Sequence, residues 1–483
     1  MDPDALRDLD AVVGRVAEAA AAAGWDVRRL GIAEPPHVDL SAAIAAALAR
    51  PVGAPPLREL ARGRRSVAII TSDATRPVPA HALLGPVMEE LRAAGVADDA
   101  IDVVIGGGAH RPATPAEVRR LLGAEWAGRL RVHCHEARAR DLVDLGRTPA
   151  GTPLLVDPRV AAADLRVAFG QVEPHEFAGF TGGRKSILPA VAGERSILAN
   201  HAVANLSHPL ARPGVLEGNP IHEDMLAAAR IARLDFIVNV VLGGDLQALA
   251  AAAGAFDAAH AELVAFVRGY AQLQPPEEPV DVVVTGPGAP LDINLYQSSK
   301  PLVGLQPMVE AMAARVRARA AAGLRAGDGA IGRRPPVVVL LSRCWDGTGS
   351  TDMLEPFDGA SGPQAVLARL REHYTVEMNE SFSIARFLTV CPQVVACCPG
   401  VPDDVLRRLF FTPAPSPAAA LKTALGLAAA AGVVSGEAPG DGEPAARRPS
   451  VLLFPRAHRA LFTVESRAGA APVSSSPVSS PER

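Results

Sequence analysis

The sequence predicts an α/β fold, made of two α/β domains with mainly parallel sheets that meet at a cleft. Short apolar runs alternate with amphipathic helical stretches, which is typical of strands covered by helices on both faces. The chain has 483 residues, too many for one compact core. A Pro- and Glu-rich stretch at 271–281 interrupts the alternation, and the same pattern then starts again.

The first domain is predicted to span residues 1–275. Its strand candidates are apolar runs ending in polar residues or glycine, at 66–73, 101–108, 130–136, 164–172 and 236–244. The stretch "HALLGPVMEELRAAG" after the first strand indicates an amphipathic helix. Another helix is predicted to begin after Thr114, because Pro115 suits its first position and Glu117 completes a capping box.

The second domain is predicted at 276–462. Its strand candidates lie at 280–288, 335–342, 392–398 and 450–455, and its helix candidates at 300–323 and 363–374. Stretches rich in Gly, Arg, Pro and Glu at 322–335 and 433–449 indicate loops. The Ser/Pro-rich tail at 463–483 has few apolar residues and is predicted to be disordered.

Composition excludes several classes of protein. The net charge of −4 gives no reason to expect nucleic acid or an anionic membrane surface as a partner. The cysteine count is five, an odd number without zinc-type spacing, which favours free thiols in a cytoplasmic protein. The acidic start is unlike a signal peptide, and no apolar run reaches the ~18 residues of a membrane span.

Polar residues follow two predicted strands of the first domain at their carboxyl ends, where function gathers in open α/β sheets. Asp73 and Arg76 follow the strand at 66–73; alternatively, Asp73 caps a helix and Arg76 is a surface residue. Gly106–Gly108 end the next strand and permit a sharp turn before His110. A loop histidine by itself is more often solvent-exposed than catalytic.

A third cluster lies in "HEFAGFTGGRKSILPAVAGERSILANH", which contains His175, Thr181–Gly183, Lys185 and His201. A glycine turn entering a helix predicts a phosphate site built from the N–H groups of Thr181, Gly182 and Gly183, although the spacing is not that of a Walker loop. Lys185 near that helix end is a candidate nucleophile. Alternatively, Lys185 is a phosphate counter-charge and His201, about four helical turns on, a buried structural residue.

A fourth cluster, "YQSSK", supplies Tyr296, Gln297 and Lys300 in the second domain. A solvated loop is one interpretation; the other is that these groups face the first three clusters across the cleft. His110 and His175 could then flank a substrate as an acid/base pair, with Arg76 and Lys300 on its carboxylate. Two bases on opposite faces of one carbon suit racemisation. The residues alone do not identify the cofactor that Lys185 and His201 would hold.

The motifs "SDATRPVPAH", "GAHRPATPAE", "HEFAGFTGGRKSILPAVAGERSILANH" and "YQSSK" occur together and in this order. On these residues the chain resembles the nickel-pincer nucleotide-dependent lactate racemase family. The resemblance covers most of residues 40–310 and, more loosely, the second domain. It implies a 2-hydroxy acid racemase or epimerase, which transfers hydride through a 2-keto acid intermediate. The implied partners are the small-molecule substrate and the cofactor-synthesis enzymes.

The resemblance also implies a role for each residue. The cofactor would be nickel in pyridinium-3,5-bisthiocarboxylic acid mononucleotide, covalently bound to Lys185, with His201 as the protein ligand to nickel. His110 and His175 would exchange the substrate hydroxyl proton. The remaining positions would line the substrate and cofactor site; these are Asp73, Arg76, Tyr296, Gln297 and Lys300.

Two other functions compete with the racemase. One is a non-catalytic sensor of the cofactor or of a hydroxy acid on the same fold, which the presence of both histidines disfavours. The other is a metal-free enzyme that uses Lys185 as a Schiff base. The substrate side chain is not determined by the motifs. The stretch "CWDGTGSTDML" places Trp345 and Asp346 either in a loop that lines the cleft or, for Trp345, in the core.

Overall fold

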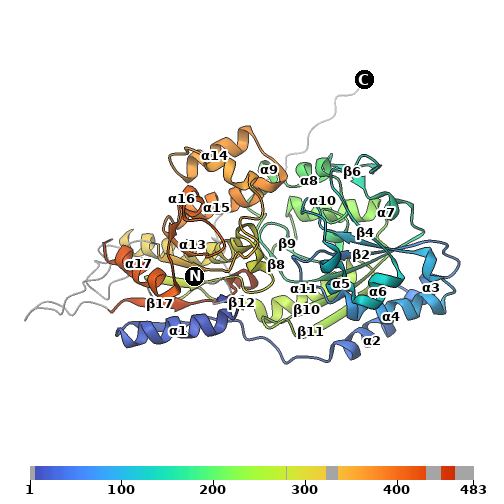
Figure 1. The fold of residues 1–483 in the computed structure, drawn as a ribbon, viewed down its shortest axis with the longest axis horizontal. Helices are drawn as coiled ribbons and strands as arrows, with labels where there is room; N and C mark the ends of the chain where they lie inside the picture. Colours follow the sequence, from blue (N-terminus) through green and yellow to red (C-terminus); the bar gives the residue numbers. More distant parts are fainter. Residues whose placement is uncertain (1–5, 279, 322–334, 431–447, 463–483) are drawn as a thin grey trace, which may run out of the picture.

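The computed structural model describes residues 6–278, 280–321, 335–430 and 448–462. The chain forms two six-stranded sheets, each covered by helices on both faces (Figure 1). Strands within each sheet are parallel except β11, which pairs antiparallel with β10. The predicted α/β class with mainly parallel sheets is confirmed. The loop predictions at 322–335 and 433–449 fall almost wholly, and the disordered-tail prediction at 463–483 wholly, outside the described residues.

The first sheet runs in the order β11-β10-β7-β2-β3-β4. In that order its strands are Ala248–Gly254, Phe236–Leu242, Leu165–Gln171, Val67–Ser72, Ile101–Gly106 and Arg131–Cys134. The helices of this half are α2 (Leu40–Ala49), α3 (Leu57–Leu60), α4 (Ala80–Ala93), α5 (Pro115–Leu122), α6 (Ala124–Arg129), α7 (Pro158–Ala162), α8 (Glu194–Asn200), α9 (Val203–Leu206), α10 (Pro220–Ile231) and α11 (Ala258–Ala271). The predicted capping box at Thr114 and Glu117 opens α5.

Alternate residues of one strand explain why helices cover both faces of this sheet. In β2, Val67 and Ile69 join the core under α2 and α4, whereas Ala68 and Ile70 join the core under α7, α10 and α11. Every one of these side chains is buried. A strand that is apolar on both faces must lie between two helical layers, so the doubly wound arrangement follows from the continuous apolar run.

The second sheet runs in the order β1-β17-β13-β14-β15-β16. In that order its strands are Asp26–Arg29, Ser450–Leu453, Val282–Thr285, Val337–Leu341, Val394–Cys397 and Thr412–Pro413. Its helices are α1 (Leu9–Ala22), α12 (Leu295–Ser298), α13 (Lys300–Ala321), α14 (Pro363–Glu372), α15 (Asn379–Val390), α16 (Asp403–Arg408) and α17 (Pro417–Ala430). Three two-stranded pieces complete the fold: β5 (Val143–Arg147) with β6 (Pro153–Val156), β8 (Pro174–His175) with β9 (Gly179–Phe180), and β12 (Gln272–Leu273) with β18 (Leu461–Phe462).

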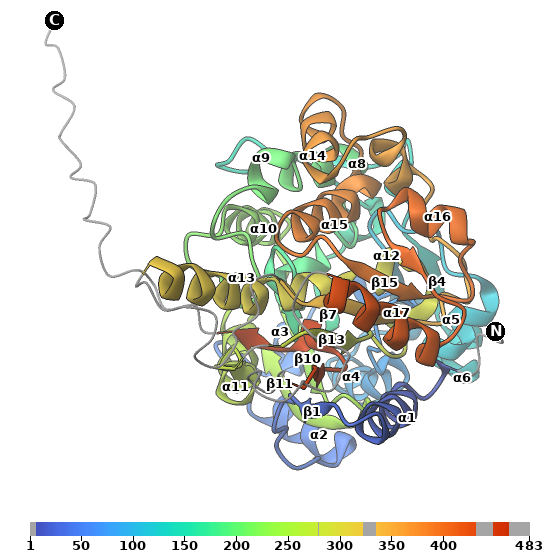
Figure 2. The ribbon, with the colours of Figure 1, turned by 90° about the vertical axis from the view of Figure 1, so that its left-hand side faces the viewer.

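The N-terminal segment belongs to the second half of the molecule, which corrects the predicted first domain of 1–275. Strand β1 pairs with β17, and α1 packs with α17 on the outer face of the second sheet. In Figure 1 the dark blue α1 lies beside β17, far from the α2 that follows it, and Figure 2 shows α1 and α17 on the same side of the sheet. The prediction failed because a short strand with mixed polarity, Asp26–Arg29, carries no sign of its distant partner.

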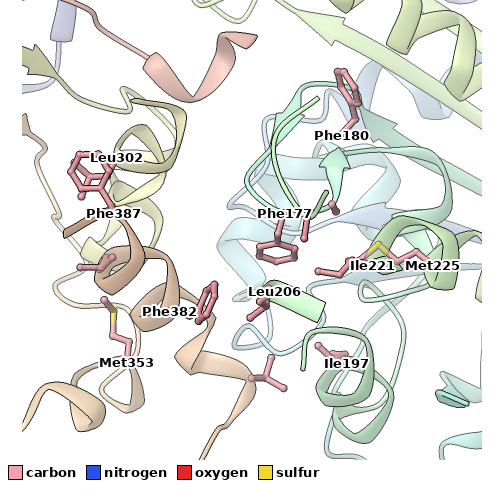
Figure 3. Close-up of a cluster of buried hydrophobic side chains, with 14 of the residues drawn as sticks. Phe177, Phe180, Ile197, Leu206, Ile221, Met225, Leu302, Met353, Phe382 and Phe387 are labelled. Atoms are coloured by element: carbon pink, nitrogen blue, oxygen red, sulfur yellow. The ribbon is translucent and has the colours of Figure 1, made fainter. Parts of the chain in front are cut away.

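One continuous core joins the two halves. Phe177, Ile197 and Leu206 from the first half and Phe382 from α15 belong to the same buried cluster (Figure 3). Helix α15 contacts α9 at this boundary.

No helix in the described ranges is long and apolar enough to cross a membrane. All five cysteines are free and four are buried, in agreement with the predicted thiols.

A substitution in α1 tests its assignment to the second sheet. Val13 is fully buried there, so Val13→Ala is expected to lower the free energy of unfolding by about 2 kcal/mol. Val38→Ala is the matched control because Val38 is exposed, and its change is expected within about 0.5 kcal/mol. Urea unfolding measures both. Equal stability of the two variants would contradict the packing of α1.

Candidate active site

A cavity of about 130 Å³ lies at the carboxyl ends of β7, β2 and β3 and is closed by the start of α12 and α13. The sequence predictions converge there. The predicted residues that line it are Asp73, Arg76, His110, His175, Thr181, Gly182, Lys185, His201, Tyr296, Gln297 and Lys300. Gly183 is the one predicted residue outside the lining. The parallel strands bring these groups together because their carboxyl ends share one edge of the sheet.

His110 is held by Asp73. Its Nδ1 lies 2.8 Å from Asp73 Oδ2, and a carboxylate only accepts hydrogen bonds, so Nδ1 carries the proton and Nε2 the lone pair. Gln297 Nε2 donates toward that Nε2 at 3.4 Å. Burial opposes the charge on Asp73, but His110, Thr75 and Arg76 outweigh it and lower the pKa of the carboxyl. His110 therefore presents an unprotonated nitrogen to the cavity.

The β8–β9 hairpin positions His175. The backbone N–H groups of Phe177 and Ala178 point at His175 Nδ1 from 3.5 and 3.4 Å, which puts the ring proton on Nε2. Burial lowers the pKa of His175 well below its usual value, while the carboxylate of Glu176, 3.3 Å from Nδ1, works in the opposite direction. The hairpin needs Gly179, whose φ is +78° and where a Cβ would lie 2.2 Å from Val215 O.

Lys185 lies in a short 3₁₀ turn, Gly183–Ser186, and lines the cavity. Burial and the charge of the neighbouring Arg184 lower its pKa well below the ordinary value, which favours the neutral amine. Arg184 itself is fully buried and hydrogen-bonds Ala178 O and Gly182 O. The chain has three lysines, and two of them, Lys185 and Lys300, line this one cavity.

One prediction about this segment is wrong. No helix runs from Lys185 to His201, since α8 begins at Glu194 and the intervening chain turns back at Ala190, whose carbonyl accepts from Gly108 just beyond β3. Two of the three N–H groups of the predicted phosphate site have other acceptors: Thr181 donates to Glu173 O at 2.9 Å, and Gly183 donates to Asn239 Oδ1 at 2.9 Å. At most the N–H of Gly182 is left for a phosphate, which stays a prediction.

His201 caps the carboxyl end of α8 and is buried against the cavity. Burial, followed by the charge on Lys185, lowers its pKa to about 3. Its Nδ1 has no hydrogen-bond partner among the described residues. Phe177 touches both histidines edge-on, with ring centres 4.7 Å from His175 and 4.9 Å from His201. A neutral imidazole with an unpartnered buried nitrogen is suited to bind a metal.

Arg76 and Lys300 differ in how their charges are compensated. In the described part of the chain no carboxylate lies within ion-pair distance of Arg76, which bonds Thr75 O and Gln297 Oε1. Lys300 Nζ instead lies 2.8 Å from Glu176 and 3.3 Å from Glu380. Burial favours the neutral amine, but both carboxylates outweigh it and raise the pKa of Lys300.

Four residues of the site were missed from the sequence. Three of them, Glu176, Phe177 and Arg184, lie inside the quoted motif. Because they are adjacent in sequence to His175 or Lys185, they could have been predicted to belong to the site. Glu380 lies in α15, 80 residues beyond Lys300, and no local pattern marks it. Tyr296 donates to Asn379 of the same helix. The tertiary contact alone brings α15 to the site.

Trp345 and Asp346 lie in the loop after β14, and the sequence left open whether they line the cleft. Trp345 is 51% exposed and is not part of the core. Asp346 lines a second cavity next to the first. One of the two residues therefore lines a cavity, and the proposed core position of Trp345 is wrong.

This combination defines a class of protein: a two-sheet α/β protein in which two histidines and an amine of lowered pKa line one cavity. The known lactate racemase N-terminal domain matches residues 24–214. The chain is 35% identical over 384 residues to a lactate racemase of Thermoanaerobacterium thermosaccharolyticum, covering 78% of this chain and 84% of that one. It is 40% identical over 256 residues to a lactate racemase of Lactiplantibacillus plantarum, covering 52% of this chain and 59% of that one.

Solved structures agree with these sequence matches. The lactate racemase apoprotein from Thermoanaerobacterium thermosaccharolyticum superposes with a TM-score of 0.73 at 29% identity, over 91% of this chain and 95% of that chain. A protein from Thermotoga maritima shares the fold, with a TM-score of 0.59 at 15% identity over 84% and 97%. This chain belongs to the lactate racemase family. The predicted family and the predicted enzyme class, an isomerase, are confirmed.

Chemical modification tests the amine of Lys185. Reductive methylation needs an unprotonated amine, and an ordinary lysine with a pKa of about 10.4 is almost fully protonated at neutral pH. Lys185 in the cofactor-free protein is therefore expected to keep a much larger share of its pH 9 rate at pH 7 than an ordinary lysine does, measured by peptide mass spectrometry. Arg184→Gln removes a neighbouring positive charge and is expected to slow the reaction at pH 7 roughly tenfold for each unit by which the pKa rises.

The exposed Lys422 is the internal reference for this experiment. Arg195→Gln, at an exposed position of α8 that does not line the cavity, is the matched control variant. A Lys185 rate that rises tenfold per pH unit between pH 7 and 9 would contradict a lowered pKa.

Proposed function

We propose that this chain racemises 2-hydroxy acids of the lactate class by removing the C2 hydrogen as hydride and returning it to the opposite face. A 2-keto acid is the intermediate. The observation that carries the proposal is one cavity that gathers His110, His175, Arg76 and the amine of Lys185. The relatives named lactate racemases support the choice of substrate.

Hydride removal needs an acceptor that no side chain supplies, and the residues present fit the nickel-pincer nucleotide, pyridinium-3,5-bisthiocarboxylic acid mononucleotide. Lys185 offers an unprotonated amine for its covalent attachment, and His201 a buried ring nitrogen for nickel. The described residues contain no group of three His, Cys, Asp or Glu side chains that could hold a metal. The remaining nickel ligands would therefore belong to the cofactor. When bound, the cofactor supplies the hydride acceptor.

The side chains of the chain then orient the substrate. The guanidinium of Arg76 binds the carboxylate, since no protein carboxylate competes for it at ion-pair distance among the described residues. An ammonium has three N–H donors, and Glu176 and Glu380 accept two from Lys300, which leaves one for the substrate. Gln297 lies between Arg76 and His110 and bonds both. Fixing the carboxylate in this way fixes C2 relative to the histidines.

The two histidines move the hydroxyl proton. His110 Nε2 accepts it directly, and the carboxylate of Asp73 stabilises the resulting imidazolium. His175 serves the other enantiomer, with Glu176 beside it to stabilise its positive charge. The two are not equivalent at rest, because His110 Nε2 carries a lone pair and His175 Nε2 carries a proton. The ring proton of His175 must move from Nε2 to Nδ1, which lies 3.3 Å from the carboxylate of Glu176, before Nε2 can act as a base.

Asp73→Asn tests the orientation of His110. An amide can donate to Nδ1 and so move the ring proton to Nε2, which removes the base. Racemisation by the cofactor-loaded enzyme, followed by chiral separation, is expected to fall roughly 10²–10⁴-fold. Asp99→Asn, an exposed position on the same half, is the control. Full activity of Asp73→Asn would exclude His110 as a base oriented by Asp73.

The covalent cofactor is tested by mass. After co-expression with the enzymes that make the cofactor, the peptide containing Lys185 is expected to carry the adduct and the protein to bind nickel. Lys185→Arg is expected to abolish the adduct, whereas Lys422→Arg is expected to retain it. An unmodified Lys185 in cells that demonstrably make the cofactor would refute this attachment.

A further inference from the structure

A second cavity adjoins the first and is larger. Its volume is about 480 Å³, and a cavity needs about 10–15 Å³ of such space for one water. The two cavities share Asp73, His110, Tyr296 and Gln297 as walls. A hydroxy acid whose C2 lies at His110 therefore has room beyond C3 in the second cavity. The methyl group of lactate would leave nearly all of it unfilled.

The charges in this cavity exclude an anionic occupant. The cation in its wall, Arg111, is already bound in bidentate fashion by Glu117 at 2.9 and 3.0 Å and lies 3.8 Å from Asp346. Glu377 adds a further carboxylate to the lining. Carboxylates thus outnumber guanidinium groups, which disfavours both a second substrate carboxylate and a nucleotide phosphate there. Lys185 and His201, the proposed cofactor residues, line the first cavity and not the second.

Most of the side chains in the wall of this cavity are polar or charged. They include Asn294, Ser350, Asp346 and Glu377, and Ile293 is its one large aliphatic side chain among the described residues. Glu377 Oε1 accepts from Arg138 at 3.3 Å. Glu377 Oε2 is buried and has no donor in the described part of the chain. A buried carboxylate oxygen calls for a hydrogen-bond donor, and a hydroxyl is a neutral one.

We propose that the second cavity binds the hydroxylated chain of a 2-hydroxy acid, and that the substrate of this enzyme is an aldonic acid of four to six carbons. This inference rests on the proposed racemase function and specifies its substrate. Arg76 and Lys300 hold the carboxylate, C2 lies between the histidines, and the hydroxyls on C3 and beyond donate to Glu377 and Asp346. Inversion at C2 would make the enzyme an epimerase, because the other stereocentres are untouched.

The test is a panel of acids with the cofactor-loaded, full-length enzyme, after the Lys185 adduct has been verified by mass. The panel contains lactate, malate, phenyllactate, erythronate and gluconate, and chiral or diastereomer separation gives kcat/KM. An aldonic acid is expected to exceed lactate at least tenfold. If lactate, malate or phenyllactate is preferred, the inference is overturned and the racemase proposal stands. If the loaded enzyme converts none of them, both are overturned.

Glu377→Gln connects the preference to the cavity. It replaces a charged acceptor with a neutral one, so kcat/KM for the aldonic acid is expected to fall about tenfold or more relative to that for lactate. Glu372→Gln, exposed on α14 and outside the cavity, is the matched control and should leave this ratio unchanged. An aldonic preference that survives Glu377→Gln would overturn the assignment of the hydroxyl chain to this cavity.

Ser350→Phe provides a second variant that does not depend on the stability of Glu377→Gln. The ring would fill part of the cavity, so conversion of gluconate is expected to fall at least tenfold more than conversion of lactate. Retained lactate conversion shows that the variant is folded. If lactate conversion is retained and gluconate conversion falls no further than it, the gluconate chain lies elsewhere and the inference is overturned.

Discussion

The ammonium of Lys300 sits between two carboxylates from opposite halves of the molecule, and the geometry of the site depends on it. Glu176 comes from the hairpin after β7, whereas Lys300 and Glu380 come from α13 and α15. None of the three side chains is more than 9% exposed, and a buried charge without its partner is strongly destabilising. The two ion pairs of Lys300 therefore fix the distance between the two halves. Arg76, Gln297 and His110 can form one connected set only because that distance is fixed.

The two lysines of the cavity show how neighbours set protonation. Burial and the neighbouring Arg184 lower the pKa of Lys185, which favours its neutral amine. Lys300 is buried as well, but its carboxylate partners raise its pKa and keep it charged. One site thus holds a nucleophilic amine and a fixed cation made from the same side chain. Desolvation acts on both, and the sign of the nearest charge decides the outcome.

Neighbouring groups also determine which ring nitrogen of each histidine carries the proton, and here they act through hydrogen bonds rather than through net charge. A carboxylate at Nδ1 of His110 and backbone N–H groups at Nδ1 of His175 place the ring protons on different nitrogens. Motifs in the sequence identified both histidines and also Asp73. They did not show that the two rings would carry their protons on different nitrogens. This depends on how the hairpin directs its backbone N–H groups at His175.

The sequence by itself determined most strands of the two sheets, the α/β class and the residues that collect at strand ends, because apolar runs and their polar termini are local properties of the chain. It also located the glycines of the motif, but it did not show that the N–H groups of Thr181 and Gly183 donate to other parts of the protein. Only the tertiary structure decided that α1 and β1 join the second sheet, that Glu380 reaches Lys300, and that a second, carboxylate-lined cavity adjoins His110. Each of these joins residues far apart in the chain, and no periodicity or spacing in the sequence records which distant surfaces will bury one another.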